Sequence, residues 1–221
     1  CRPRRGPARP PGPPLQEPFP AAMNDLDALL TEIRACRLCE AALPLGPRPV
    51  LQVGHGARVL IVSQAPGTRV HESGVPFNDA SGIRLRHWMG VDRTTFYDTA
   101  SVAIMPMGFC YPGRGVSGDL PPRKECSATW HPKLMPHLRG VGLTLLVGHY
   151  AQAWFLGERR QRTLTDTVRA WRDYAPAYFP MPHPSPRNQL WLRANPWFEE
   201  EVVPELRARI AAILEPARAI A

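Results

Sequence analysis

Residues 59–82, VLIVSQAPGTRVHESGVPFNDASG, bring together the side chains that a binding or catalytic pocket would need. The run Val59 to Val62 is typical of a buried strand, and the turn at residues 64–67 follows it directly. Such turns expose backbone N–H groups at the end of a strand, where open α/β sheets bind their ligands. The polar residues 71–73, the ring of Phe77 and a second turn come next. The stretch therefore predicts a pocket with a rigid floor, a stacking ring and titratable groups; an ordinary strand-to-helix connection is the alternative.

Four cysteines form a second group with chemical potential, as Cys36-x2-Cys39 and Cys110-x15-Cys126. A fifth, Cys1, lies in a proline-rich segment and is not counted as a ligand. In a chain expected to be intracellular, such a set indicates a metal, a cluster or plain burial and not a disulfide framework.

The composition fits a soluble protein with a polyanionic partner. The net charge is +8, of which residues 1–22 contribute +3, and the pI is about 9.8. No apolar run approaches the roughly 18–20 residues of a membrane span, and none resembles the core of a signal peptide. We therefore expect a cytoplasmic protein with no membrane association.

Both ends of the chain differ from its middle. Residues 1–22 contain eight prolines, which predicts a disordered tail, and we expect the functional protein to start near Met23. One domain is expected over residues 23–215, followed by a short tail at 216–221.

Four strands are expected, and each ends in a loop with unusual residues. They cover residues 59–62, 99–105, 143–147 and 178–181, and predicted helices lie between and around them. The helices are expected from residue 24 or 25 to about 35, near 83–89, at 123–138, 151–156 and 164–171, and from a cap at Asn195 to the C-terminal region, where Pro204 should kink or delay the helix. Strands that alternate with helices predict a parallel sheet covered on both faces.

Three of these features together resemble the uracil-DNA glycosylase superfamily over roughly residues 25–210. They are the strand with its Gln64-Ala65-Pro66-Gly67 turn, the Gly74-Val75-Pro76-Phe77 segment, and a late strand that ends in residues 183–186, His-Pro-Ser-Pro. The cysteine order is similar to that of the iron–sulfur, family 4-like branch. The resemblance implies a three-layer α/β/α sandwich with a central four-stranded parallel sheet. It also implies hydrolysis of the N-glycosidic bond of a damaged base in DNA, usually uracil, as the first step of base excision repair.

The resemblance implies roles for particular residues of the site. Phe77 would stack on an extruded base, and His183 would donate to the uracil O2 as negative charge develops. The turn residues Gln64, Ala65, Pro66 and Gly67 would present backbone amides and position the attacking water. The segment Pro184, Ser185, Pro186 and Arg187 would enter the DNA minor groove.

Two departures from the family pattern concern catalysis and selectivity. Ala65 stands where many members carry an acidic or amide residue that activates water, so His71 or Glu72 is expected to take over, with His71 favoured. Met105 and Pro106 stand where an Asn often reads the uracil edge. Selectivity would then come from backbone groups or Asn78, or extend to hypoxanthine and xanthine.

The resemblance also implies a structural 4Fe–4S cluster on Cys36, Cys39, Cys110 and Cys126. The first pair would bind one face of the centre, and the second would clamp the N-terminal helix to the loop after the second strand. Zinc is the competing interpretation, but zinc ribbons usually carry two short CxxC knuckles, whereas Cys110 and Cys126 lie far apart.

Three functions remain open at this point. The first is an active monomeric glycosylase associated with the nucleoid through DNA. The second is a protein that binds uracil-containing or damaged DNA with little turnover. The third is a nucleotide- or phosphate-binding module built on the Ala65-Pro66-Gly67 turn, although no glycine-rich phosphate motif of standard spacing is present.

Overall fold

A four-stranded sheet forms the centre of the protein, for which a computed structural model describes residues 23–116 and 118–215. The expected tails at 1–22 and 216–221 lie outside the described residues. All strand pairs are parallel, and the order in the sheet is β2-β1-β3-β4. The strands are β1 (Val59–Val62), β2 (Val102–Ile104), β3 (Leu143–Val147) and β4 (Tyr178–Met181). The chain leaves β1 toward one neighbour and later returns to its other side, which creates the crevice where such folds bind ligands.

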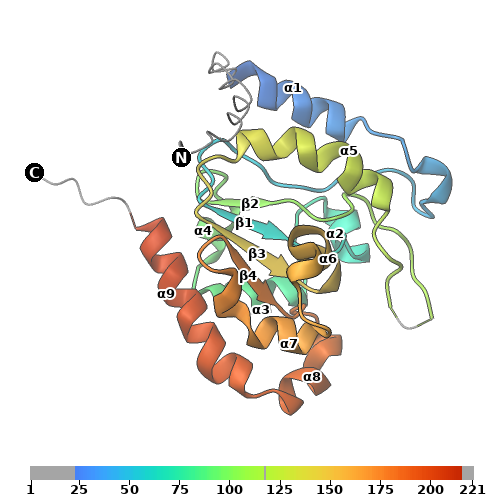
Figure 1. Ribbon diagram of the computed structural model, residues 1–221. Coiled ribbons are helices and arrows are strands. Elements are labelled where there is room, and N and C mark those ends of the chain that lie inside the picture. The colour runs from blue at the N-terminus through green and yellow to red at the C-terminus, as the bar shows by residue number, and fades with distance from the viewer. Residues whose placement is uncertain (1–22, 117, 216–221) are drawn as a thin grey trace, which may run out of the picture.

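Helices cover both faces of this sheet, as the sequence predicts (Figure 1). The helices are α1 (Met23–Arg34), α2 (Thr68–Ser73), α3 (Ala80–Met89), α4 (Arg93–Tyr97), α5 (Lys124–Leu134), α6 (His149–Leu156), α7 (Leu164–Arg169), α8 (Gln189–Ala194) and α9 (Val203–Leu214). The core on one face packs strand side chains against α3, α4, α7, α8 and α9. The core on the other face packs the alternate strand residues against α1, α5 and α6. The expected three-layer α/β/α sandwich is confirmed.

Local sequence accounts for several helix boundaries. Asp79 caps α3 by accepting a hydrogen bond from the Gly82 N–H at 2.9 Å. The same helix ends at Gly90, whose φ of +69° is the left-handed conformation that glycine adopts at low cost. Pro204 lies in the first turn of α9, directly after a π-helical turn at residues 198–202, so the irregular helix stands where the proline cannot donate an N–H.

Three local expectations need correction. Residues 68–73 form the short helix α2 and not an extended loop. Ile83, one of the apolar residues from which the helix near 83–89 is expected, is 65% exposed and does not pack with the others. The expected single C-terminal helix is divided, because residues 198–202 form a π-helical turn before α9 begins.

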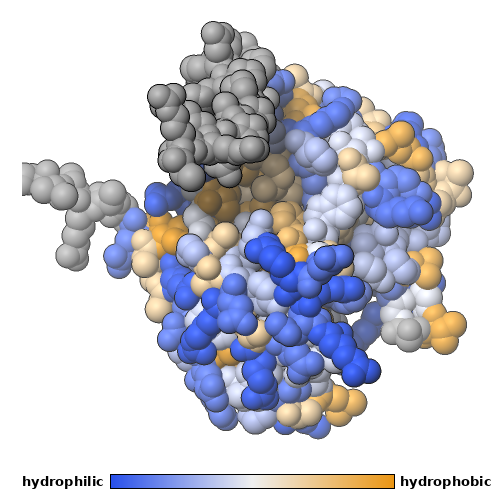
Figure 2. Space-filling view, in the orientation of Figure 1, coloured by the Kyte–Doolittle hydropathy of each residue, from blue (hydrophilic) through white to orange (hydrophobic). Residues whose placement is uncertain are grey.

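The surface is mainly hydrophilic in the orientation of Figure 1, with scattered hydrophobic patches (Figure 2). Within residues 23–116 and 118–215, no helix is long and apolar enough to cross a membrane.

Candidate functional site

A cavity of about 750 Å³ opens at the carboxyl ends of the strands and is called the main cavity below. The segments that follow all four strands contribute to its lining. Its residues include Ser63, Gln64, Ala65, Pro66, Gly67, Phe77, Asp79, Pro106, Asp119, Gly148, His149, Tyr150, His183, Ser185, Pro186, Arg187 and Asn188. A volume of this size suits a small organic ligand or a nucleotide.

Phe77 belongs to both the cavity wall and the core. Its ring is 8% exposed and meets Phe96 edge-on, with 6.2 Å between the ring centroids. Its backbone has a φ of +53°, an uncommon value for a bulky residue. A Cβ at Gly82 would lie 1.8 Å from the Phe77 carbonyl oxygen, so this turn requires glycine at position 82. The ring is therefore held by a tightly packed turn, whereas the neighbouring Asn78 is exposed and is not part of the lining.

His183 is half-buried in the main cavity, and its hydrogen bonding defines its tautomer. The Ser185 N–H donates to Nδ1 at 3.2 Å, so Nδ1 is the unprotonated nitrogen and Nε2 carries the proton. Burial lowers the pKa of His183, while the negative charges of Asp79 and Asp119 oppose that shift. The side chain is thus a neutral imidazole with an N–H to donate.

The loop that carries His183 is braced from two sides. The Asn188 side-chain amide donates to the His183 carbonyl at 2.8 Å. The Arg84 guanidinium donates to the carbonyls of Pro184 and Ser185 at 3.4 and 3.3 Å, and to Gln189 Oε1 at 2.9 Å. Pro184 is buried, while Pro186 and Arg187 are exposed at the cavity rim. The brace fixes the position of the imidazole, and Arg187 is the exposed cation next to it at the rim.

Asp79 and Asp119 are the acidic residues of the main cavity, and sequence reasoning missed both as site residues. Asp79 uses Oδ1 to cap α3, and no hydrogen bond to its Oδ2 occurs within the described residues. Asp119 lies 3.9 Å from Arg187, across the cavity mouth. Asp79 could have been singled out as a carboxylate two residues after Phe77, whereas only tertiary structure brings Asp119 to the site.

His71 and Glu72 do not line the main cavity. The His71 ring is 8% exposed and lies beside Tyr111, with 6.2 Å between the ring centroids. Its pKa is lowered by burial first and by the charge of Arg48 second. Glu72 is exposed. The α2 helix accounts for this placement, because it turns residues 68–70 toward the cavity and the next two residues away from it.

Residues 113–116 and 118–122, called the strap below, form a hairpin-like loop (Figure 1), and Gly118 and Asp119 of the strap line the main cavity. The Gly115 N–H donates to the Gly118 carbonyl at 2.6 Å, and the Leu120 N–H to the Gly113 carbonyl at 2.9 Å. The Gln64 side-chain amide donates to the Leu120 carbonyl at 3.1 Å. Gln64 therefore holds the strap against the end of β1.

The end of β2 presents a proline to the main cavity. Met105 is fully buried in the core, and Pro106 lines the cavity. The Pro106 carbonyl accepts a hydrogen bond of 2.9 Å from His131 Nε2, which must carry the proton because a carbonyl cannot donate. His131 is 2% exposed and stacks on Phe109 with 6.0 Å between the centroids. Burial lowers its pKa, so α5 supports the cavity floor through a neutral imidazole.

The four cysteines Cys36, Cys39, Cys110 and Cys126 line a separate cavity between the segment after α1, the segment after β2 and the start of α5. The Phe109 N–H donates to Cys126 Sγ at 3.3 Å, and the charge of Arg123 is among the influences that oppose the burial-raised pKa of Cys39. Burial raises the pKa of Cys110 to about 11 and that of Cys126 to about 12. Within the described parts of the chain, no three Cys, His, Asp or Glu side chains form a group suited to one metal ion. The cysteines nevertheless share one cavity, in which the Phe109 N–H donates to a sulfur.

The fold and the main cavity define an α/β protein with a cavity at the carboxyl edge of a parallel sheet, lined by a neutral histidine, two aspartates and an aromatic ring. A family model described as "Uracil DNA glycosylase superfamily" matches residues 52–207, which is more than half of the chain. The chain belongs to the uracil-DNA glycosylase superfamily. Membership supports a DNA glycosylase-type hydrolase that acts in DNA repair on a DNA substrate.

Proposed function

We propose that this protein is a DNA repair glycosylase that removes uracil, and to a lesser degree other deaminated bases, from DNA. The observation that carries the proposal is His183, a neutral imidazole whose Nδ1 is already occupied and whose Nε2–H is available to a ligand. A base inside a duplex cannot reach such a cavity, so the target nucleotide must be extruded or single-stranded.

Hydrolysis of the glycosidic bond assigns roles to the groups around the cavity. Water adds to C1′ as the C1′–N bond breaks, and the base leaves with the electron pair of that bond. The Nε2–H of His183 donates a hydrogen bond to the base oxygen on which negative charge develops, and this hydrogen bond lowers the barrier. Asp79, whose Oδ2 is free of internal hydrogen bonds, orients the water and takes its proton. The departing base anion then acquires a proton from solvent.

Asp79 is a better candidate for the water activator than the residues expected from sequence. His71 and Glu72 lie outside the main cavity, whereas Asp79 lines it and is close enough to His183 to influence its pKa. We expect Asp79→Asn to slow excision strongly, while His71→Ala and Glu72→Gln, in folded protein, stay near the wild-type rate.

Base selectivity follows from the floor of the main cavity. Pro106 offers no side-chain hydrogen bond, and Asn78 is not part of the lining. The base edge would therefore be read by backbone groups and by small side chains such as Ser63. Such a site discriminates less sharply than a side-chain amide, so hypoxanthine and xanthine are expected as slower substrates.

The DNA strand would run along the rim formed by Ser185, Pro186 and Arg187. Arg187 and Pro186 are exposed, and the Arg84 brace holds the backbone beneath them. A rigid proline-containing loop with an outward cation suits contact with the phosphate backbone next to an extruded nucleotide.

We further propose that Cys36, Cys39, Cys110 and Cys126 hold a 4Fe–4S cluster. The shared cavity and the Phe109 N–H donor to Cys126 Sγ fit a cluster. A single zinc ion would require its four sulfurs within about 4 Å of each other, given Zn–S distances of about 2.3 Å. Among the described residues the cysteines form no group suited to a single metal ion, whereas a cluster binds each sulfur to a different iron. The cluster would supply structural cross-linking of the α1, β2 and α5 segments.

The proposal is tested with a labelled oligonucleotide that contains one uracil, followed by alkaline cleavage of abasic sites. Parallel substrates carry hypoxanthine, xanthine or a mismatched thymine, and iron and acid-labile sulfide are measured on the same preparation. Cleavage at uracil is expected, with slower cleavage at hypoxanthine and xanthine. Cluster-loaded protein that binds the uracil oligonucleotide without cleaving it would instead establish the DNA-binding alternative, which Ala65 in the water-activating position favours.

A further inference from the structure

A second cavity, of about 670 Å³, lies next to the main cavity and has no part in the chemistry described above. It is enclosed by the strap, the first turn of α5 and one side of α6. Its lining includes Leu120, Pro121, Lys124, Tyr150 and Trp154. Because α5 and α6 begin on the side where β2 and β3 end, this cavity opens at the same edge of the sheet as the main one.

The walls of the second cavity are unusually apolar for an open surface. The Trp154 residue is 46% exposed and Leu120 is 43% exposed, so the described part of the chain leaves both only partly covered. Exposed apolar surface gathered in a concavity marks a place where a ligand or partner completes the packing. An indole face offers such a ligand a flat stacking platform.

The two cavities are adjacent and have one lining residue in common. Tyr150 lines both of them, and the strap is the partition: Gly118 and Asp119 face the main cavity, while Leu120 and Pro121 face the second. The hydrogen bond from Gln64 to the Leu120 carbonyl fixes this partition to the end of β1. A polymeric ligand with one unit bound in the main cavity would therefore place its next unit across the strap, in the second cavity.

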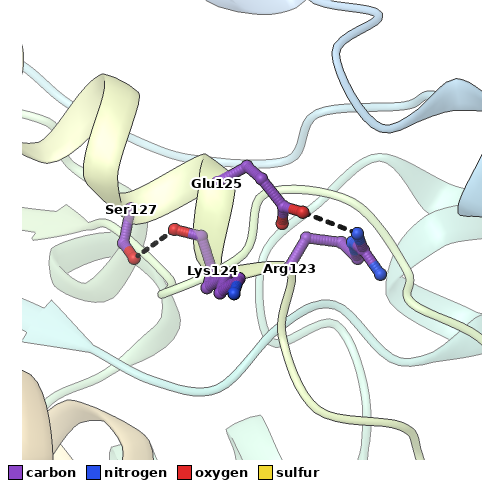
Figure 3. Close-up of polar contacts among 4 residues, drawn as sticks. All are labelled: Arg123, Lys124, Glu125 and Ser127. Carbon is purple, nitrogen blue, oxygen red and sulfur yellow. Dashed lines mark hydrogen bonds and ion pairs between the residues drawn. The ribbon is translucent and has the colours of Figure 1, made fainter.

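Charge at the rim indicates an anionic ligand. Arg123 and Glu125 form an ion pair at 2.7 Å and offset each other (Figure 3). Lys124 is exposed and makes no ion pair within the described residues, so it leaves one positive charge at the rim. In Figure 3 its ammonium has no polar contact with the other three residues drawn. Aromatic stacking beside a cation is the combination that binds single-stranded nucleotides.

We propose that the second cavity binds the nucleotide adjacent to the extruded one, with its base stacked on Trp154 and its phosphate near Lys124. This inference rests on the proposed function, since it takes DNA as the ligand of the main cavity. The target nucleotide and its neighbour are then both held out of a regular stack, one on each side of the strap. The second cavity would thus favour DNA that is unstacked or single-stranded around the lesion.

The test is a double-mutant cycle between Trp154 and the flanking base, measured as binding and not as turnover. The end-labelled single-stranded probe carries one 2′-fluoro uracil nucleotide, whose glycosidic bond resists hydrolysis. In two further probes, the base on one side or the other is replaced by an abasic sugar. Wild-type protein should lose about 5- to 100-fold in affinity when the correct flanking base is missing, as expected for one stacking contact. Trp154→Ala should bind the intact probe equally weakly and lose almost nothing more on either abasic probe.

Matched variants distinguish the loss of stacking or of charge from a loss of folding stability. Trp154→Phe, which retains a ring, should restore most of the flank dependence and the wild-type thermal stability. Lys124→Gln should flatten the salt dependence of binding, whereas Lys133→Gln, on the same helix but paired with Glu32, should not.

The outcomes distinguish failure of the second-cavity proposal from failure of the proposed function. If wild-type protein binds the uracil probe but Trp154→Ala shows the same loss on the abasic probes as wild type, the second-cavity proposal is wrong. The exposed apolar surface would then be assigned to a peptide or protein partner. If wild-type protein does not bind the uracil probe at all, the proposed function fails as well.

Discussion

Replacing His183 by alanine tests the proposed chemistry most directly. The substitution removes the Nε2–H that the Ser185 hydrogen bond to Nδ1 leaves available in the main cavity. It leaves the loop brace in place, because Arg84 and Asn188 contact backbone carbonyls and not the imidazole. DNA binding should therefore be retained, and the loss should fall on the chemical step.

The magnitude follows from the loss of one neutral donor in a partly dehydrated site. Removal of one oxyanion-hole donor typically lowers the rate about 100- to 1,000-fold, or roughly 2.7–4 kcal/mol. We expect a loss of that order in single-turnover excision of uracil, with the Kd for the uncleavable probe changed by less than about threefold. His183→Gln, which keeps an N–H donor, should recover part of the rate.

The pH profile provides an independent readout. Protonation of Nδ1 would place an N–H against the Ser185 N–H, so the wild-type rate should fall on the acid side, below the ordinary histidine pKa of 6.5. His183→Gln should lack that acid limb. His55→Ala, an exposed histidine before β1, serves as the control. A His183→Ala rate within threefold of wild type, or an unchanged acid limb in the glutamine variant, would refute the assigned role.

Three further expectations concern positioning and stability. Arg84→Ala should lower the excision rate about 10-fold or more in folded protein, because the carbonyls of Pro184 and Ser185 lose their brace, and Arg84→Lys should restore part of it in the same single-turnover assay. His131→Phe keeps the ring but leaves the Pro106 carbonyl without its donor, so thermal unfolding should show a loss of about 1–3 kcal/mol and a Tm lower by several degrees. The pKa values of His71, His131 and His183 are all lowered, so below about pH 6.5 the folded state binds fewer protons than the unfolded chain. The free energy of unfolding in urea should therefore fall as the pH is lowered from 7.5 to 5.5. A flat profile would contradict these shifts.

The sheet could be predicted almost completely because its strands are continuous apolar runs bounded by turn residues. The bounds of β1, β3 and β4 coincide with the expected ranges, and β2 lies inside its range. Helix phase was harder to predict. Ile83 and Leu85 are two residues apart and cannot share a helix face, so only one of them fits the stripe with Trp88 and Met89.

The site could be predicted only where its residues follow strands directly. His183 and the turn after β1 meet in the main cavity, as the shared edge of a parallel sheet requires. The position of His71 outside the main cavity could not be predicted, because a six-residue helix with a glycine cap gives little signal in sequence and this helix turns the side chain away. Asp119 could not be found, because it reaches the cavity through the contact of the strap with Gln64, more than fifty residues earlier in the chain.

The close approach of Gly82 to Phe77 restricts how this site can vary over evolutionary time. Any side chain at position 82 would collide with a backbone carbonyl, which cannot rotate away as a flexible side chain could. A change there would require the turn at Phe77 to change in the same step, so the two positions should vary as a pair or not at all. Homologous sequences that keep the turn should therefore carry glycine at position 82, even where the residues that contact the base have diverged.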